Sequence, residues 1–501
     1  MAASIKISKS GVCLLLGGFA IVGAQLAACS PEFHSCYERR NCPVKPKDDA
    51  GAAGEEFGGA GAGPSAGSSG GRRNGGGGSS AGSSEAGEGG TSGEGGTSGE
   101  GGAASSGDAG AAGEAPVCNE CANGFACSTT TCKTTCAADA DCLADHFCSG
   151  GQCRLDAVQV SVGYSHACIV LADKTVSCWG KNDRSQLGTA SAADSATPVQ
   201  VKFLSNVQSI AVGDGITFAL LTDGTVQFWG TRITNFIAGG SSTTVASQYP
   251  TAMNGLSKVK QITAGGRGNG CATLMDGTAR CWNLNEMGQL GDGTYDFSVA
   301  PVVVSGLSGV TNVDFGYAFA CSQAANAVKC WGNNFGGQLG TISDSVANTP
   351  QTISGLSGTF SKLRTGDEFA CVLMADGSVR CWGSNGYGQL GNGSSSAKET
   401  TPVTVSAVSG ITDLALATSH TCALLKGGSV RCWGNNSRGQ IGNGNTTNPI
   451  VTPTPVQGIS DAVALAAGGS TTCAILTTGS VRCWGLIVGT EETYVVATTA
   501  W

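Results

Sequence analysis

Short apolar runs, interrupted by a polar turn, recur along the second half of the chain. In residues 371–382, two such runs flank the dipeptide Asp376-Gly377. Alternating apolar positions are typical of half-buried strands, and Asp-Gly between two of them favours a tight turn. The pattern predicts a β-hairpin, and similar hairpins recur from residue 158 to about residue 490.

A tryptophan closes every hairpin, and the spacing of the tryptophans gives the repeat length. The seven residues are Trp179, Trp229, Trp282, Trp331, Trp382, Trp433 and Trp484. They are separated by 50, 53, 49, 51, 51 and 51 residues. Self-similarity at such a period indicates a repeat architecture, in which each unit buries its apolar face against its neighbours.

Cysteines provide an independent test of the hairpins, because residues equidistant from a turn lie opposite each other in an antiparallel pair. Six repeats carry cysteines nine or ten residues apart: Cys168 with Cys178, Cys271 with Cys281, Cys321 with Cys330, Cys371 with Cys381, Cys422 with Cys432 and Cys473 with Cys483. In the second repeat both positions change together, to Phe218 and Phe228. Opposed cysteines are close enough to bond, so we predict six structural disulfides, each contributing at most about 3 kcal/mol.

After its tryptophan, each full repeat continues through Trp-Gly-x-Asn into Gly-Gln-Leu-Gly, as in residues 382–391. Together with Gly366-x-x-x-x-Cys371-x-Leu373, this sequence resembles the regulator-of-chromosome-condensation repeat, which has about 51 residues per blade. The resemblance covers residues 158 to about 490. It implies an all-β fold, a seven-bladed β-propeller with four-stranded blades. The Gly-Gln-Leu-Gly loop is missing after Trp229 and Trp484, so we expect remodelled blade edges there.

The two ends of the repeat region suggest how the ring closes. The first repeat begins at residue 158 without the Pro-Val strand that precedes the others, and the chain ends in a second β-prone segment. We therefore expect residues 493–499 to supply the missing strand and to join the first and last blades.

The N-terminus has the features of an export signal. Lys6 and Lys9 precede an apolar stretch that ends at Leu26-Ala-Ala-Cys29. This quartet resembles the lipobox of bacterial lipoproteins, which implies cleavage after residue 28 and lipidation of Cys29. Ser30 follows the cysteine, and by the same resemblance it favours the outer membrane of a Gram-negative bacterium. An ordinary secretory signal is the alternative.

A flexible stalk is expected between the lipid anchor and the folded parts. Residues 29–47 form an anchor segment in which Cys36 and Cys42 could close a small loop. Residues 48–115 consist mainly of Gly, Ala, Ser and Glu and have almost nothing apolar to bury, which predicts a disordered linker. A Gly-rich chain of this length spans roughly 45 Å on average.

A small cysteine-rich module, at residues 116–154, precedes the propeller at 155–501. Its cysteines are Cys118, Cys121, Cys127, Cys132, Cys136, Cys142, Cys148 and Cys153. A segment this short cannot fold on apolar burial alone, so we expect disulfides, and the eight cysteines leave 105 possible pairings. A zinc site at Cys118-x2-Cys121 is the alternative, but the spacing does not recur and the compartment is oxidising.

Composition excludes several classes of function. The formal net charge is −8 with 28 Lys and Arg in 501 residues, so no basic surface is available for nucleic acid. We found no phosphate-binding loop, nucleophile elbow or cluster of metal ligands, and we expect neither a cofactor nor a metal.

Candidate ligand contacts lie where the repeat stops fixing residue identity, in the loop just before the first cysteine of each hairpin. They are Tyr164, Ser165, Asp214, Arg267, Tyr317, Asp367, Glu368, Thr418, Ser419 and Ser470. The side that carries the Gly-Gln-Leu-Gly loops is the alternative location. Two positions before the cysteine, His166 and His420 match the repeat family, and we expect them only to form hydrogen bonds within their own blades.

The resemblance alone does not name a function, because this architecture serves a nucleotide exchanger, a photoreceptor and an enzyme inhibitor alike. What these share is macromolecular binding. We therefore expect a membrane-anchored, surface-displayed binding protein with a protein or polysaccharide ligand. An extracytoplasmic hydrolase using Asp367 and Glu368 is the main alternative, and guanine-nucleotide exchange, which needs a cytosolic partner, is a remote one.

Overall fold

The computed structural model describes residues 126–128, 131–132, 135–149, 151–237, 241–325, 327–343, 345–486 and 493–499. The predicted signal peptide, lipidation site, anchor segment and linker lie outside these residues, as do Cys118 and Cys121. Within the described part, the strands form seven four-stranded sheets and two two-stranded ones. None of the helices in that part has the length and apolar character needed to span a bilayer.

The seven larger sheets are the propeller blades, and each is an antiparallel meander of consecutive strands. Blade 1 contains β5 (Ala157–Val162), β6 (His166–Leu171), β7 (Val176–Gly180) and β8 (Ser195–Gln200). Blade 2 contains β9 (Val207–Val212), β10 (Ile216–Leu221), β11 (Val226–Ile237) and β12 (Ser241–Ala252). Blade 3 contains β13 (Val259–Ala264), the short helix η3 (Gly266–Gly268), β14 (Gly270–Leu274), β15 (Ala279–Asn283) and β16 (Ser298–Val303).

The remaining blades follow the same order. Blade 4 contains β17 (Asn312–Phe315), β18 (Phe319–Ala324), β19 (Ala327–Gly332) and β20 (Ala347–Thr352). Blade 5 contains β21 (Phe360–Thr365), β22 (Phe369–Met374), β23 (Val379–Ser384) and β24 (Lys398–Thr404). Blade 6 contains β25 (Ile411–Leu416), β26 (His420–Leu425), β27 (Val430–Gly434) and β28 (Ile450–Pro455). Blade 7 contains β29 (Ala462–Gly468), β30 (Thr471–Leu476), β31 (Val481–Leu486) and β32 (Thr493–Thr499).

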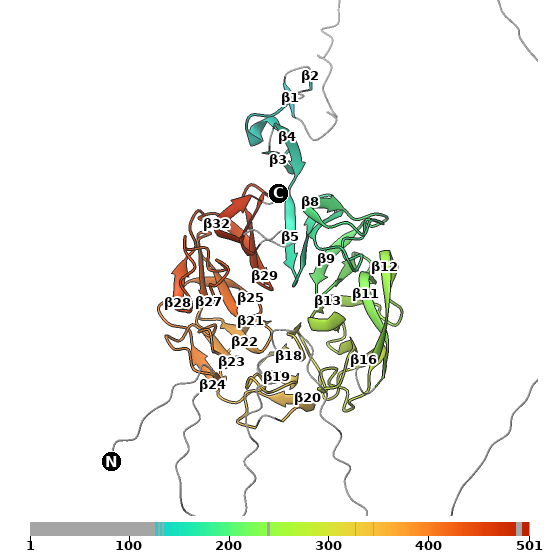
Figure 1. The fold of residues 1–501 in the computed structure, drawn as a ribbon, viewed down its shortest axis with the longest axis vertical. Coiled ribbons are helices and arrows are strands. Elements are labelled where there is room, and N and C mark those ends of the chain that lie inside the picture. Colours follow the sequence, from blue (N-terminus) through green and yellow to red (C-terminus); the bar gives the residue numbers. More distant parts are fainter. Residues whose placement is uncertain are drawn as a thin grey trace, which may run out of the picture. The chain divides into compact units, whose positions relative to one another are not determined.

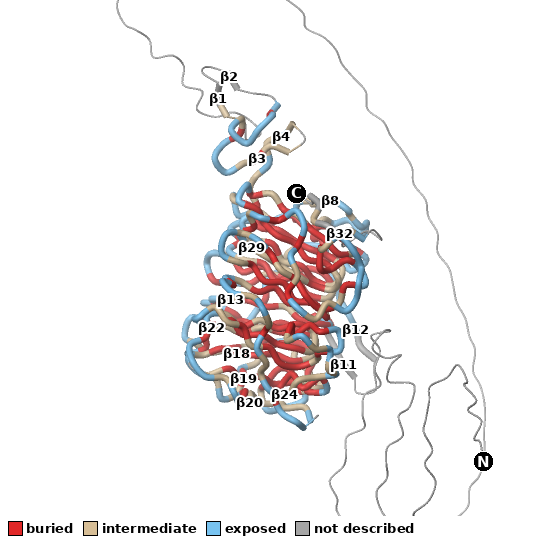
Figure 2. Tube along the Cα trace, turned by 90° about the vertical axis from the view of Figure 1, so that its left-hand side faces the viewer, coloured by how far each residue is buried: buried red, intermediate tan, exposed pale blue. Residues whose placement is uncertain are grey.

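The blades stand around a central channel, with their first strands innermost (Figure 1). Apolar side chains fill the spaces between neighbouring blades, so the core is divided into one cluster at each blade interface. The seven tryptophans of the repeats belong to these clusters and are at most 1% exposed. Figure 2 shows the result, a buried interior beneath exposed loops.

The predicted hairpins are present, and all six predicted cysteine pairs are disulfides between the second and third strands of their blades. The bonds join Cys168 with Cys178, Cys271 with Cys281, Cys321 with Cys330, Cys371 with Cys381, Cys422 with Cys432 and Cys473 with Cys483. The Cα atoms of each pair lie 4.0 to 4.1 Å apart, and all twelve cysteines are fully buried. The two phenylalanines of blade 2, Phe218 and Phe228, oppose each other in the same register. An apolar pair thus replaces the disulfide there.

The expectation for ring closure was wrong in its assignment. Residues 493–499 do form a strand, β32, but β32 pairs with β31 of its own blade, and blade 1 already has four strands of its own. The Pro-Val segment is the last strand of a blade and not the first. The blade without a Pro-Val strand is therefore blade 7, and β32 takes that place. The first and last blades meet by packing, with Val160 and Ile169 in the same core cluster as Ile475 and Val481.

The described part of the cysteine-rich module is held by two disulfides, one joining Cys136 with Cys148 and the other joining Cys142 with Cys153. It contains β1 (Cys127–Ser128), β2 (Thr131–Cys132), the short helix η2 (Asp139–Asp141), β3 (His146–Ser149) and β4 (Gln152–Leu155). The η2 carboxylates accept backbone N–H groups, Asp139 from Cys148 at 2.7 Å and Asp141 from Ala137 at 2.7 Å. These contacts explain the two aspartates between the cysteines.

Candidate functional site

The loops at one end of the propeller form a continuous surface, which we call the loop face. It consists of the connections between the first and second strands (first loops) and between the third and fourth strands (third loops). Backbone hydrogen bonds join the two sets: Lys181 N–H donates to Ser165 O at 2.8 Å, and Ser384 N–H donates to Glu368 O at 2.9 Å. The candidate contacts and the Gly-Gln-Leu-Gly loops therefore lie on the same side, and the prediction that they occupy alternative sides was wrong.

The glycine after each tryptophan makes this junction possible. Gly383 has φ +107°, and a Cβ there would lie 2.5 Å from the carbonyl oxygen of Glu368. Glycine accepts both the left-handed conformation and the close approach without strain. Blade 3 is the exception, because Asn283 takes this position with φ +92°, and its first loop coils into η3.

The third loops seal the blade interfaces. The indole N–H of Trp331 donates to the carbonyl oxygen of Gln289 in the preceding blade at 3.0 Å, and Trp382 does the same to Gln338 at 2.9 Å. Equivalent bonds join Trp229 to Gln186, Trp433 to Gln389 and Trp484 to Gln440. Trp179 and Trp282 follow blades 7 and 2, whose sequences lack Gly-Gln-Leu-Gly, and their indole nitrogens are buried with no partner among the described residues.

The innermost strands line a channel of about 300 Å³. Their free edges are satisfied by side chains from the neighbouring blade. Gln159 both accepts from Ile210 N–H at 2.9 Å and donates to Ile210 O at 3.0 Å, while Asp314 accepts from Thr365 N–H at 2.8 Å. Each of these bonds joins residues 51 positions apart on the first strands of neighbouring blades. They pair backbone groups that would otherwise be left unbonded at the strand edge, and they also link the blades.

Three predicted contacts meet across the channel mouth on the loop face. Tyr164 of blade 1 donates its phenolic hydroxyl to the Asp367 carboxylate of blade 5. The ring of Tyr164 also packs edge-to-face on Tyr317 of blade 4, with centroids 6.1 Å apart. Burial and the neighbouring Asp367 carboxylate raise the pKa of Tyr164 well above its ordinary value, so it remains a neutral donor. Tyr164 thus bridges the mouth of the channel.

The comparisons with known proteins agree with this architecture. A model of the regulator of chromosome condensation (RCC1) repeat matches residues 175–220, 328–373, 376–424 and 427–475. A second model of the same repeat matches residues 157–186, 360–389 and 411–440. Together the two models place RCC1 repeats at residues 157–220 and 328–475 of the propeller.

Similar proteins come from different contexts. The ultraviolet-B receptor UVR8 of Arabidopsis thaliana is 28% identical over 338 residues, covering 65% of this chain and 76% of the receptor. The E3 ubiquitin-protein ligase HERC2 of Homo sapiens is also 28% identical, over 62% of this chain but only 7% of the ligase. The RCC1 propeller is therefore shared, and RCC1-like propellers commonly mediate protein binding.

Solved structures show the same fold. Prp20p of Saccharomyces cerevisiae aligns with a TM-score of 0.57 and 20% identity, over 69% of this chain and 87% of Prp20p. Human WBSCR16 aligns with a TM-score of 0.56 and 18% identity, over 64% of this chain and 92% of WBSCR16.

The other predicted contacts of the RCC1 propeller are separate from the Tyr164 bridge. Arg267 is exposed, and its guanidinium lies 3.7 Å from the Glu286 carboxylate. The Asp214 carboxylate lies 3.5 Å from the guanidinium of Arg184 in blade 1. Ser419 is buried, where its hydroxyl accepts from Asn435 at 3.3 Å. Ser165, Thr418 and Ser470 are half-buried on the loop face.

Glu368 stands out electrostatically among the first-loop residues. Its side chain is half-buried beside Asp367, and burial together with the Asp367 charge raises the pKa of Glu368 to about 7. At neutral pH this carboxyl is therefore partly protonated, and a cationic group placed beside it would favour the ionised form.

Two aromatic residues that were not predicted as contacts extend this region. Phe335 of blade 4 and Tyr387 of blade 5 lie in third loops and are 53% and 40% exposed. Gly336, next to Phe335, abuts the first loop of blade 5, because a Cβ there would lie 3.2 Å from Glu368 Cβ. The sequence did contain a signal for these contacts: in each loop a bulky aromatic residue stands between the Asn and Gln positions that the repeat fixes. We call Tyr317, Phe335, Asp367 and Glu368 the blade 4/5 patch. Tyr387 lies in the next third loop of the loop face, where the adjacent Gly388 abuts Val451 of blade 6.

The two family-type histidines are structural, but they act between blades and not within them. His166 Nε2 lies 2.7 Å from the hydroxyl of Thr217 in blade 2, and His420 Nε2 lies 2.7 Å from that of Thr472 in blade 7. Both histidines are fully buried, and burial lowers the pKa of each to about 3. They are neutral links across their interfaces.

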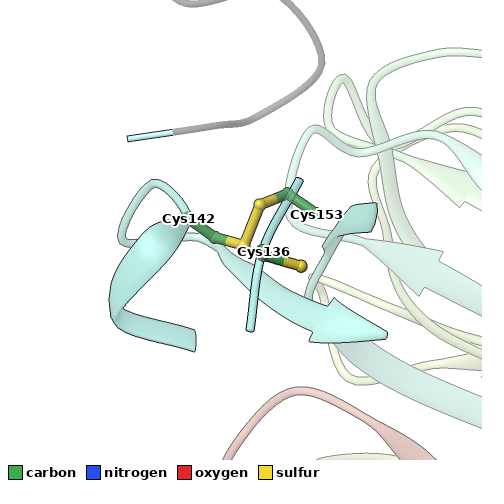
Figure 3. A group of neighbouring side chains, drawn as sticks. All are labelled: Cys136, Cys142 and Cys153. Atoms are coloured by element: carbon green, nitrogen blue, oxygen red, sulfur yellow. A yellow bond between two sulfur atoms is a disulfide. The ribbon is translucent and has the colours of Figure 1, made fainter. Parts of the chain in front are cut away.

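Three sulfur atoms gather in the cysteine-rich module, from Cys136, Cys142 and Cys153, all within 4.8 Å of one another (Figure 3). Each belongs to a disulfide, two of them to the same one. A disulfide sulfur is not a thiolate ligand, so this cluster is the centre of a small covalent core.

Proposed function

We propose that this chain is a membrane-anchored, surface-displayed binding protein whose loop face binds a protein partner, with polysaccharide as the other ligand class. The blade 4/5 patch carries the proposal. It places the exposed Phe335 in the loop that abuts Glu368, next to the half-buried carboxyls of Asp367 and Glu368, and Tyr387 adds a second exposed aromatic residue to the loop face. A few residues supply most of the binding energy in protein interfaces, where aromatic residues are enriched, and complementary charges supply specificity.

The charge of the patch favours a partner that inserts a cationic side chain. Asp367 is already held by Tyr164, so its position is fixed before binding. Glu368 has its pKa raised to about 7, and a Lys or Arg beside it would lower that pKa, because the cation stabilises the ionised carboxylate. Binding should therefore strengthen as the pH rises from about 6 to about 8.

The entry point of the chain into the propeller supports the loop face as the free side. Asp156 connects the cysteine-rich module to blade 1, and its carbonyl oxygen accepts from Ala172 N–H at 2.9 Å. The next residue, Ala157, donates to Gly479 O at 2.9 Å. Both partners lie at hairpin turns, at the end of the blades opposite the loop face. The chain therefore enters the propeller at the end opposite the loop face, which leaves the loop face clear of this connection.

Relatives support a protein as the ligand class. Prp20p was studied for its binding to Gsp1p and histones, and yeast RCC1 (Prp20) has been solved with Kap60 bound. The present chain aligns with these structures at 20% identity or less, so their particular partners are not carried over. An exported lipoprotein would not meet a cytosolic GTPase, which is why we do not propose nucleotide exchange.

Capture from envelope and secreted fractions tests the proposal with two matched variants of the full chain. The first combines Phe335→Ser, Glu368→Gln and Tyr387→Ser on the loop face. The second combines Phe203→Ser and Tyr249→Ser, two exposed aromatics in contact at the rim, with ring centroids 5.2 Å apart. We expect a partner that the wild type and the rim variant bind equally and the loop-face variant binds at least about 10-fold more weakly. Equal binding by both variants would place the site elsewhere.

A hydrolase is the second candidate, and the raised pKa of Glu368 favours it. A protonated carboxyl next to an ionised one is the arrangement of general acid and base in glycoside hydrolysis. Glu368→Gln would then abolish turnover of a panel of glycans and peptides and leave capture of the substrate intact. A binding protein instead shows no turnover in the wild type and loses affinity in the variant.

A further inference from the structure

The outer edges of the blades are protected by proline, with one exception. The fourth strand of each blade has no further strand beside it among the described residues. Six of these strands carry a proline directly before the residue that opposes the third-strand cysteine, or Phe228 in blade 2, where the register of the ladder shifts: Pro198, Pro250, Pro301, Pro350, Pro402 and Pro453. Proline on an edge strand prevents another chain from pairing there.

The register shows that each proline removes an outward-facing donor. The cysteines of the second and third strands, such as Cys168 and Cys178, are 4.0 Å apart at Cα, which identifies a pair without mutual hydrogen bonds. Cys178 therefore directs its backbone groups toward the fourth strand, where it is opposite Val199. Because the pattern alternates, the next position, Pro198, has its backbone nitrogen directed away from the sheet. No ladder bond is lost inside the blade.

Blade 7 departs from this rule. Cys483 is opposite Thr498, so Ala497 stands where the other blades have proline. The whole strand β32, Thr-Tyr-Val-Val-Ala-Thr-Thr, contains neither proline nor charge and is rich in β-branched residues. Its described side chains hold it in place, with Tyr494 packed on the interface of blades 7 and 1, and Ala497 on that of blades 6 and 7. β32 is therefore a firmly held strand whose outer edge keeps its N–H at residue 497.

We propose that β32 pairs antiparallel with β32 of a second copy of this chain, joining two seventh blades into one eight-stranded sheet. A twofold axis brings the same segment to both sides of the contact, so the segment must be complementary to itself. An uncharged, β-branched strand meets that condition, since no like charges oppose each other across the axis. The contact uses the rim of the ring and leaves the loop face of both copies open.

Sedimentation equilibrium of the full chain with Cys29→Ser, which avoids detergent, measures this association. Ala497→Pro is the informative variant, because six other blades fold with proline at that position. Ala497→Ser is the control, since serine keeps the backbone N–H. We expect a concentration-dependent dimer for the wild type and for Ala497→Ser, and at least about 10-fold weaker dimerisation for Ala497→Pro with an unchanged melting temperature.

A second variant covers the case in which Ala497→Pro disturbs the fold. Thr493 is exposed at the start of β32, and Thr493→Lys places a charge on the edge in both copies, which should weaken the dimer as proline does. Amide exchange adds a direct measurement: residues 493–499 should become more protected as the concentration rises. A wild-type monomer at all concentrations, or a dimer that neither variant weakens, would overturn the proposal. So would a monomer whose β32 is protected only by another protein's strand.

Discussion

Among the described residues, a hydrogen bond from the next blade's tryptophan to a third loop seals five blade interfaces and is absent from two. At the sealed interfaces, among them that between blades 3 and 4, a glutamine carbonyl accepts the next blade's indole N–H. At the interfaces between blades 7 and 1 and between blades 2 and 3, Trp179 and Trp282 are as deeply buried, but their N–H groups have no partner among the described residues. Burying an unpaired donor costs about 1 to 3 kcal/mol. Apolar packing therefore places the tryptophan, and the loop adds a hydrogen bond to it.

The comparison also shows that the third loop has two separate roles, one in sealing the blade interface and one in presenting side chains to solvent. The fixed Asn and Gln side chains are buried and bond within their own loop, and the Gln carbonyl accepts from the next blade, whereas the residues between them, such as Phe335 and Tyr387, are exposed to solvent. A sealed interface can thus carry a variable contact surface at little cost to the ring. Blade 2 gives up the seal for the long strands β11 and β12, and this exchange is tolerated because the rest of its interface remains packed.

The largest expected effect is acid destabilisation of the two interfaces that contain histidine. Burial lowers the pKa of His166 and His420 to about 3 from an ordinary 6.5. The unfolded chain therefore takes up protons first as the pH falls below 6.5, and stability is lost progressively between pH 6.5 and about 3. At about pH 4 each histidine should cost roughly 3 kcal/mol. Thermal melting across this range measures the loss.

A pair exchange identifies the histidine contribution. Phe319 and Ala370 occupy the equivalent positions between blades 4 and 5 and lie in one core cluster. The double variant His420→Phe with Thr472→Ala copies that pair and should lose less stability on acidification than the wild type. Identical acid profiles would show that carboxylates elsewhere dominate the loss.

The second effect concerns the close contact between the last glycine of a Gly-Gln-Leu-Gly segment and the tryptophan of the next blade. Gly291 has φ +68°, and a Cβ there would lie 2.6 Å from Trp331 Nε1. Gly291→Ala should destabilise the propeller by about 3 kcal/mol, from left-handed strain together with displacement of the ring. Gly377→Ala is the matched control, with φ +81° but nothing within 4 Å of its Cβ, and should cost only about 1 to 2 kcal/mol. Equal losses in urea unfolding would mean that the tryptophan contact contributes nothing.

Features that repeat could be predicted from the sequence, because each blade supplies an independent copy of the same physical constraint. The disulfides follow from hairpin symmetry, and the joint change to Phe218 and Phe228 marks the same pair of positions. The sequence does not show where one blade ends and the next begins, because an outer strand can belong to the blade before it or to the blade after it. Only the hydrogen bonds of β32 to β31 decide this.

Contacts across the ring had no signal in the sequence. Tyr164 and Asp367 are 203 residues apart and occupy positions where the repeat does not fix identity. Their shared place in the first loops could be predicted, but a bond between them could not. The hydrogen bond from each histidine to the next blade was missed for a related reason. Its threonine partner is 51 or 52 residues away, and hairpin symmetry predicts only partners within the same blade.

The smallest effect tests the comparison of interfaces directly. Trp331→Phe removes an indole N–H that is bonded to Gln289 O, and it leaves that buried carbonyl without its donor. Trp282→Phe removes a similar volume but an N–H that has no partner among the described residues. Both variants lose packing, so the difference between them isolates the seal. We expect Trp331→Phe to lower the free energy of unfolding by about 1 to 2 kcal/mol more than Trp282→Phe does. Chemical denaturation of the two variants side by side measures this difference, and equal losses would mean that the third loop shapes the loop face without stabilising the ring.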